Sequence, residues 1–137
     1  MKIARWTAII HTLFFILLPA GIARADWTGA EIGKEISWEV VHLLDWGTTL
    51  DIADNPDEYR EVGLARVFIG EHPSRGEVNT YMGICAVLHP VVTHLLPNKA
   101  YIFGAEWNPR AWWQHLTIVG SGACVANNFG IGLRLAF

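Results

Sequence analysis

The chain has 137 residues, of which 52% are hydrophobic and 17% are charged, and its formal net charge is −3. This length fits one domain, the apolar content excludes a disordered chain, and the acidic balance excludes the basic surface of a nucleic-acid-binding protein. Two cysteines are too few for a disulfide-dense scaffold or a four-thiolate zinc site.

Charge is distributed unevenly along the chain. Residues 1–25 carry three bases and no acid, residues 26–77 carry twelve acids and four bases, and residues 78–137 carry three bases and one acid. The windows 6–23, 78–98 and 111–133 contain no charge at all, and their lengths are near the roughly 20 residues that a helix needs to cross a bilayer core. The sequence therefore predicts an acidic, water-facing part and two or three membrane-associated helices.

Residues 1–25 have the layout of a secretory signal peptide. A basic start, Met1–Arg5, precedes the apolar stretch Ile9–Leu18, and Ala23-Arg24-Ala25 forms an A-x-A-like cleavage site before Asp26. The alternative is an uncleaved N-terminal anchor, because the apolar stretch merges into a longer uncharged run. Either interpretation places the rest of the chain in a bacterial cell envelope, at the inner membrane with an extracytoplasmic part or in the periplasm.

Residues 26–51 are predicted to form a helix, with Thr28 and Glu31 spaced as a capping box. One apolar stripe follows at helical spacing: Ile32, Ile36, Val40, Leu43, Gly47 and Leu50. A second, more polar stripe comprises Glu35, Trp38, His42, Asp45 and Thr49. His42 and Asp45 can meet on the helix surface, as a general base or half a metal site requires. The alternatives are a solvated pair and a polar contact between packed helices.

The segment 55–77 contains a second helix signal. Asn55-Pro56-Asp57-Glu58 has the composition of a helix start and predicts a short helix over about 56–69, ending at Gly70. A turn-rich loop over 71–76 follows. Glu71 and His72 are neighbours in this loop and could converge on one ligand there, or they could serve only to structure the loop.

The uncharged windows predict helices over 78–97 and 110–133. In the first, Pro90 interrupts the helix, and His89 and Thr93 lie four residues apart on the turn that Pro90 frees. In lipid, His89 and His94 would be candidates for ligand or proton chemistry, whereas in a water-soluble domain they would be satisfied core residues.

The second window begins with two tryptophans, Trp112 and Trp113, which suit a membrane interface. Small residues at every fourth position would let helices approach closely: Gly122, Ala126 and Gly130. The positive-inside rule then places the loop between Lys99 and Arg110 in the cytoplasm, with a fully periplasmic helical domain as the alternative.

Cys85 and Cys124 lie one in each window. In an oxidising compartment they could form a disulfide that joins the two helices, or they could be small buried residues with free thiols.

The order of motifs between residues 44 and 81 resembles a group of small exported or membrane proteins of proteobacteria and their phages. In that group an Asp-x-x-x-Thr helix precedes a Glu, a Gly-x-x-Pro turn and an Asn-x-Tyr helix start. The matching residues are Asp45, Thr49, Glu61, Gly70, Pro73, Asn79 and Tyr81. The resemblance implies a location and a helical fold but no activity. Many members carry Gln where Thr48 stands, which argues against catalysis at that position.

Together these features predict an all-α, small helical bundle without catalytic activity. It would act by helix packing or by binding membrane lipid or another envelope protein, and a homo-oligomer is compatible with this. No cofactor is indicated, and no H-E-x-x-H, G-x-S-x-G, Walker A or C-x-x-C motif occurs. The alternative is a membrane-associated enzyme or metal-binding protein that uses His42, Asp45, Glu61 and His72. The remaining candidate binding residues are Thr49, Asn79 and His89.

Overall fold

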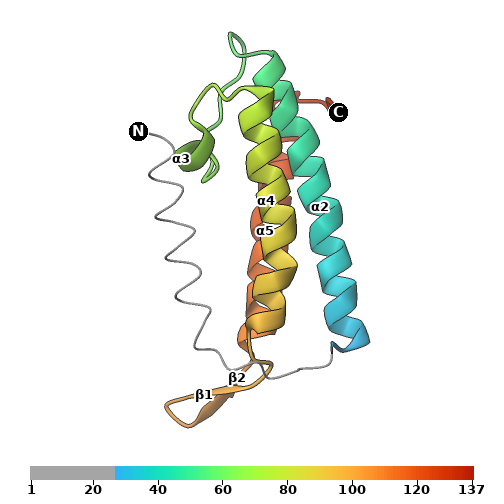
Figure 1. Cartoon of the computed structure of the whole chain (residues 1–137), viewed down its shortest axis with the longest axis vertical. Coiled ribbons are helices and arrows are strands. Elements are labelled where there is room, and N and C mark those ends of the chain that lie inside the picture. The colour runs from blue at the N-terminus through green and yellow to red at the C-terminus, as the bar shows by residue number, and fades with distance from the viewer. Residues whose placement is uncertain (1–26) are drawn as a thin grey trace.

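The computed structural model describes residues 27–137, which form a bundle of three long helices. Helices α2 (Gly29–Asp54), α4 (Arg75–Leu95) and α5 (Pro109–Gly130) lie side by side, with α4 antiparallel to the other two (Figure 1). The short helix α3 (Arg66–Ile69) lies at one end of the bundle, and a hairpin of β1 (Ala100–Ile102) and β2 (Ala105–Trp107) lies at the other. The predicted helical class is confirmed, whereas the signal peptide prediction falls outside the described residues.

Two capping boxes determine where α2 and α4 begin. The Thr28 hydroxyl accepts from the Glu31 amide, and the Glu31 carboxylate accepts from the Thr28 amide, as the sequence predicted. Ser74 and Glu77 make the same reciprocal pair, so α4 starts at residue 75. The predicted start at residue 78 is therefore wrong by three residues, about one turn.

The helix predicted over about 56–69 is mostly a loop. Asn55 closes α2 instead of opening a new helix, because its side chain donates to the Asp51 carbonyl and carboxylate. The Glu61 amide donates to the Glu71 carbonyl, and this contact closes the loop on itself. Only Arg66–Ile69 is helical, and it ends at Gly70, whose φ of +88° favours glycine.

The apolar core is small and lies at the α3 end of the bundle. It comprises Leu50, Ile69, Val78 and Met82. The C-terminal residues cover this end: the Ala136 amide donates to the Gly47 carbonyl, and the Leu135 and Phe137 side chains lie so close to Gly47 that a Cβ there would meet them at 2.8 and 2.9 Å.

The two stripes of α2 are oriented opposite to the usual arrangement. Most of the apolar stripe points outward, since its exposed members are Ile32, Ile36, Val40 and Leu43. The polar stripe points inward, and its buried members are Glu35, Trp38, His42 and Thr49. Of the apolar stripe, only Gly47 and Leu50 are buried. The polar stripe makes the contacts between packed helices.

The two uncharged windows are helical, but membrane-spanning helices are not found. Within residues 27–137, no helix has both the length and the apolar character that crossing a bilayer would require. The physical reason is that polar residues occur in the middle of both windows, among them His89 and Thr93 in α4 and Gln114 and Asn128 in α5. A Cβ added at Gly122 or Gly130 would meet no atom within 4 Å, so these two glycines do not serve a close helix contact within the described part.

Candidate functional site

Six polar side chains meet inside the bundle near the hairpin, and we call them the polar core: Glu31, Glu35, His89, Arg110, Gln114 and Thr117. They come from all three long helices. Five of the six are buried, and Thr117 is partly buried. The polar core therefore takes the place that apolar side chains occupy in an ordinary bundle.

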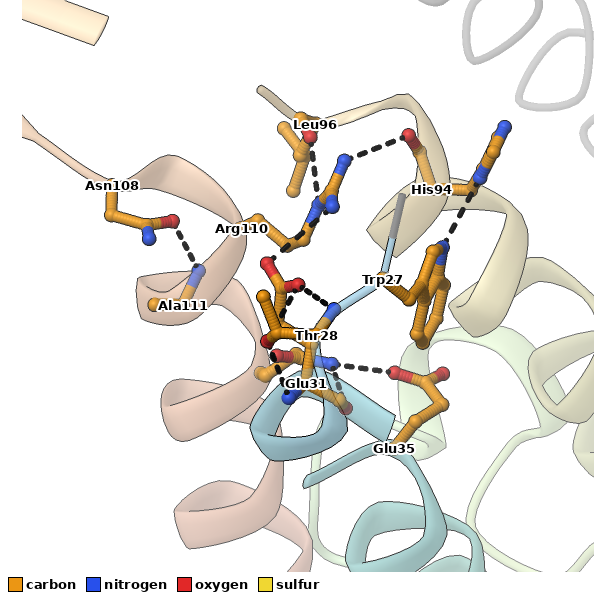
Figure 2. Close-up of polar contacts among 10 residues, drawn as sticks. Trp27, Thr28, Glu31, Glu35, His94, Leu96, Asn108, Arg110 and Ala111 are labelled. Carbon is orange, nitrogen blue, oxygen red and sulfur yellow. Dashed lines mark hydrogen bonds and ion pairs between the residues drawn. The ribbon is translucent and has the colours of Figure 1, made fainter. Parts of the chain in front are cut away.

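Arg110 is the cation of the polar core and is 0% exposed. Figure 2 shows its guanidinium directed toward Glu31, His94 and Leu96. Its guanidinium lies 3.4 Å from Glu31 Oε1 and donates to the carbonyls of His94 and Leu96 at the end of α4. Burial raises the pKa of Glu31, but hydrogen bonds from Thr28 and the charge of Arg110 outweigh burial and lower it overall. The sequence analysis placed Arg110 at the end of a cytoplasmic loop. In the structure it is instead buried, and it joins α5 to α2 through an ion pair and to α4 through two carbonyls.

Glu35, His89 and Gln114 connect the same three helices one turn deeper. Nδ1 of His89 lies 2.6 Å from Glu35 Oε1, and since a carboxylate only accepts, this nitrogen is the donor. Nε2 of His89 lies 2.8 Å from the Thr117 hydroxyl, and the Gln114 amide donates to Glu35 Oε2. Burial lowers the pKa of His89 more than Glu35 raises it, so the imidazole is neutral near pH 7.

An aromatic stack closes the polar core on the α2 side. The Trp38 ring stacks on His89 at a centroid distance of 3.6 Å and on His42 at 4.6 Å. Trp113 contacts the His89 ring as well, at 5.3 Å. His89 is therefore held by rings as well as by hydrogen bonds, which leaves its imidazole little freedom to meet a ligand.

A second polar group, the Asp45 cluster, lies nearer the α3 end and comprises Asp45, Thr48, Glu61 and Asn128. The Asn128 side chain donates to Asp45 Oδ1 and to the Thr48 hydroxyl, which ties α5 to α2. Glu61 reaches this cluster from the loop, and its carboxylate accepts from the Gly63 amide. Burial, together with the charge of Glu61, raises the pKa of Asp45 to about 7.

The four residues of the enzyme or metal-binding hypothesis do not gather in one place. Asp45 and Glu61 interact electrostatically. His42 instead turns its Nε2 to the Met82 carbonyl at 3.0 Å, and burial lowers its pKa. His72 is exposed in the loop. The predicted His42–Asp45 contact is absent from the hydrogen bonds of the described residues.

The other predicted site residues lie apart from the polar core. Thr49 is buried in α2, and Asn79 accepts a hydrogen bond from the Trp46 indole at 2.8 Å. Cys85 and Cys124 are free thiols, so the disulfide is not formed. Burial raises the pKa of both thiols, which makes them weak nucleophiles near pH 7.

The described residues offer no group of three or more His, Cys, Asp or Glu side chains that could hold a metal ion. Two buried side-chain atoms of the described residues have no hydrogen-bond partner: the carbonyl oxygen of Gln114, in the polar core, and the indole N–H of Trp113, which contacts His89. Comparisons of the chain with protein-family models, with curated proteins and with solved structures found no match. The site is thus defined by its geometry alone.

Sequence reasoning identified His89 as a candidate but missed most of the other residues that join the three helices. Arg110 was assigned to a loop and Glu31 only to a helix cap, and Gln114 and Thr117 give no signal when they are considered singly. The sequence did contain one signal for these partners. Glu35 lies on the same stripe of α2 as Trp38, which indicates that this stripe faces the other helices. A carboxylate on that stripe needs polar partners, and the uncharged windows supply them with His89 and Gln114.

Proposed function

We propose that this chain is a small, non-catalytic protein of the bacterial cell envelope that associates with membrane lipid through its apolar exterior. The single observation that supports this is the exposure of large aliphatic side chains on all three long helices, while polar side chains lie buried between these helices. Large exposed apolar surfaces mark interaction sites, since water-soluble monomers seldom leave such surfaces uncovered.

We define the apolar exterior by the outward aliphatic residues of the three long helices: Ile32, Ile36, Val40, Leu43, Val87, Leu88, Val91, Leu116 and Val119. All three helices contribute to this surface. A protein partner of similar size would cover one face of the bundle, whereas lipid can cover several faces at once. The fully exposed positions of α2 between residues 36 and 50 carry no charge, and the same holds for α4 between 79 and 94 and for α5 between 111 and 130.

The polar core supports a non-catalytic role. Most of its polar atoms bond to one another or to backbone carbonyls, and a group that makes such contacts is not free to bind a substrate. In an apolar surrounding, internal hydrogen bonds of this kind also hold helices together where the hydrophobic effect contributes little. Helix packing is therefore the role that we assign to Glu35, His89 and Gln114.

Membrane fractionation tests this proposal. The full-length chain is expressed in a bacterium, and the membranes are washed with alkaline carbonate. We expect the protein in the pellet. A double variant, Val40→Glu with Leu116→Glu, should shift it to the supernatant, because ionised carboxylates cannot be buried in lipid. Arg60→Glu adds acidic charge in the exposed loop and is the matched control. Recovery of the unaltered chain in the supernatant would contradict the proposal.

A further inference from the structure

The β1–β2 hairpin presents aromatic side chains at one end of the bundle. Its strands pair Ala100 with Trp107 and Ile102 with Ala105, and the turn is Phe103-Gly104. Both turn residues have positive φ, +51° and +82°, as a type I′ turn requires. Phe103 is the unusual residue here, since this conformation favours Asn, Asp or Gly, and its ring is fully exposed, at 105% of the reference area.

Four exposed aromatic residues define what we call the aromatic end: Tyr101, Phe103, Trp107 and Trp112. Trp112 extends this surface onto α5, beside a shallow hollow that it lines with Asn108, Ala111 and His115. From there the surface continues along α5 into the apolar exterior at Leu116. Tyr and Trp are the residues that prefer the boundary between lipid headgroups and acyl chains.

Charge distinguishes the aromatic end from the opposite end of the bundle. The segment 51–77 carries seven acids and three bases, and much of it is exposed. At the aromatic end, Lys99 pairs with Glu106 at 3.3 Å, and Arg110 is buried against Glu31. Anionic phospholipid repels the acidic end. It does not repel the aromatic end, because the charges there are paired with one another.

We propose that the hairpin inserts into the interfacial region of a phospholipid bilayer, with Phe103 leading and the acidic end remaining in water. This inference rests on the proposed contact between the apolar exterior and lipid, and it names the end of the molecule that enters. The cost of holding Phe103 in a left-handed turn is then offset by transfer of its ring out of water.

Vesicle flotation with the purified full-length chain tests the proposal. The vesicles contain only phosphatidylcholine and phosphatidylglycerol. Phe103→Asn is the informative variant, because Asn-Gly is a preferred type I′ pair and the hairpin is kept while the ring is removed. We expect its partition coefficient to fall about tenfold. Phe103→Trp should bind like the parent, and so should Phe137→Asn, which removes an exposed ring at the opposite end.

Hydrogen exchange gives an independent measurement of the same event. Amides 100–107 should exchange more slowly when vesicles are present, whereas amides 55–65 should not change. Flotation of the parent with no loss in Phe103→Asn would overturn the hairpin inference and leave the proposed function standing. Absence of flotation in the parent would overturn both. Protection of the hairpin by protein-containing membranes but not by pure lipid would assign it to a protein partner and overturn the lipid assignment.

Discussion

At the scale of single residues, Arg110 in α5 joins its own helix to both α2 and α4. Its guanidinium contacts Glu31 and the backbone carbonyls of His94 and Leu96 at the C-terminal end of α4. Buried ion pairs contribute little net stability when they are intact, but removing one partner leaves the other charge without compensation. The position is therefore far more sensitive to substitution than its location beside a hairpin suggests.

We expect Arg110→Met to lower the free energy of unfolding by about 3–5 kcal/mol, because the buried Glu31 carboxylate and two carbonyls lose their partner. Urea denaturation followed by circular dichroism measures this change. Arg60→Met, at an exposed loop position, is the matched control and should change stability by less than about 0.5 kcal/mol. The double variant Arg110→Met with Glu31→Leu should recover part of the loss. Equal stability of the two single variants would refute the assignment.

Asp45 gives the fold a pH dependence whose sign is set by its raised pKa. The folded chain keeps a proton on Asp45 up to about pH 7, whereas the unfolded chain releases it near 3.8. Stability from this group is present at low pH and is lost as the pH rises from about 4 to about 7. His42 and His89 act in the opposite direction, because their lowered pKa values make the fold lose stability as the pH falls below 6.5.

Asp45→Asn separates these two contributions. Between pH 5 and pH 8, the parent should lose about 2 kcal/mol of unfolding free energy relative to this variant. The Asp45→Asn variant keeps His42 and His89, so its unfolding free energy should still fall below pH 6.5. Asp57→Asn, at an exposed position in the turn after α2, is the matched control. A constant difference between parent and Asp45→Asn across this range would show that Asp45 is ionised throughout.

At the scale of the element, α2 shows what a hydrophobic pattern does and does not determine. The spacing of Ile32, Ile36, Val40 and Leu43 correctly indicates a helix and one apolar stripe. It does not say which medium covers that stripe, and here the stripe faces outward. The capping box at Thr28 was predictable because it involves residues three apart. The loop after Asn55 was not, because a long-range contact between Glu61 and Glu71 shapes it.

The same distinction explains how much of the site could be predicted. His89 and Asp45 were identifiable as polar residues in helical, mostly apolar segments. Their partners Glu35 and Asn128 are 54 and 83 residues away in the chain, and no local spacing links them. The first pair depends on the antiparallel packing of α4 on α2 and the second on the parallel packing of α5 on α2, which only the tertiary structure reveals.

Two positions on the apolar stripe of α2 provide a matched test of its orientation. Ile36 is 59% exposed and Leu50 is 2% exposed, although both belong to the same predicted stripe. In detergent solution, Leu50→Gln should destabilise the chain by about 2–4 kcal/mol, because it places an amide among Ile69, Val78 and Met82. Ile36→Gln should change stability by less than about 0.5 kcal/mol. Equal losses, measured by thermal unfolding, would mean that Ile36 is buried too.

At the scale of the whole molecule, the C-terminal residues close the end of the bundle that α3 leaves open. Leu133 is buried, the Arg134 amide donates to Asp51, and the Arg75 guanidinium donates to the Ala136 carbonyl. These contacts connect the tail to both α2 and α4. The small apolar core beneath it, centred on Leu50, depends on this cover.

Removal of residues 131–137 should therefore lower the unfolding free energy by about 2–4 kcal/mol, mainly through loss of the buried Leu133 side chain and exposure of the core. Removal of Phe137 alone should have a much smaller effect, since its side chain is 74% exposed. Differential scanning calorimetry of both truncations measures the difference. A stable protein without residues 131–137 would show that the tail only rests on the bundle.

Because the bundle has three long helices, an odd number, the two ends of the described chain lie at opposite ends of the bundle. The Trp27 indole donates to His94 near the hairpin, while Ala136 contacts Arg75 at the start of α4, so the first and last described residues lie at opposite poles (Figure 1). A helix of 21 residues separates these poles by about 30 Å. A reporter fused behind Phe137 would sample the acidic pole, and one fused ahead of Trp27 would sample the aromatic pole. Reporters at the two ends of the described chain would therefore report on opposite poles of the bundle.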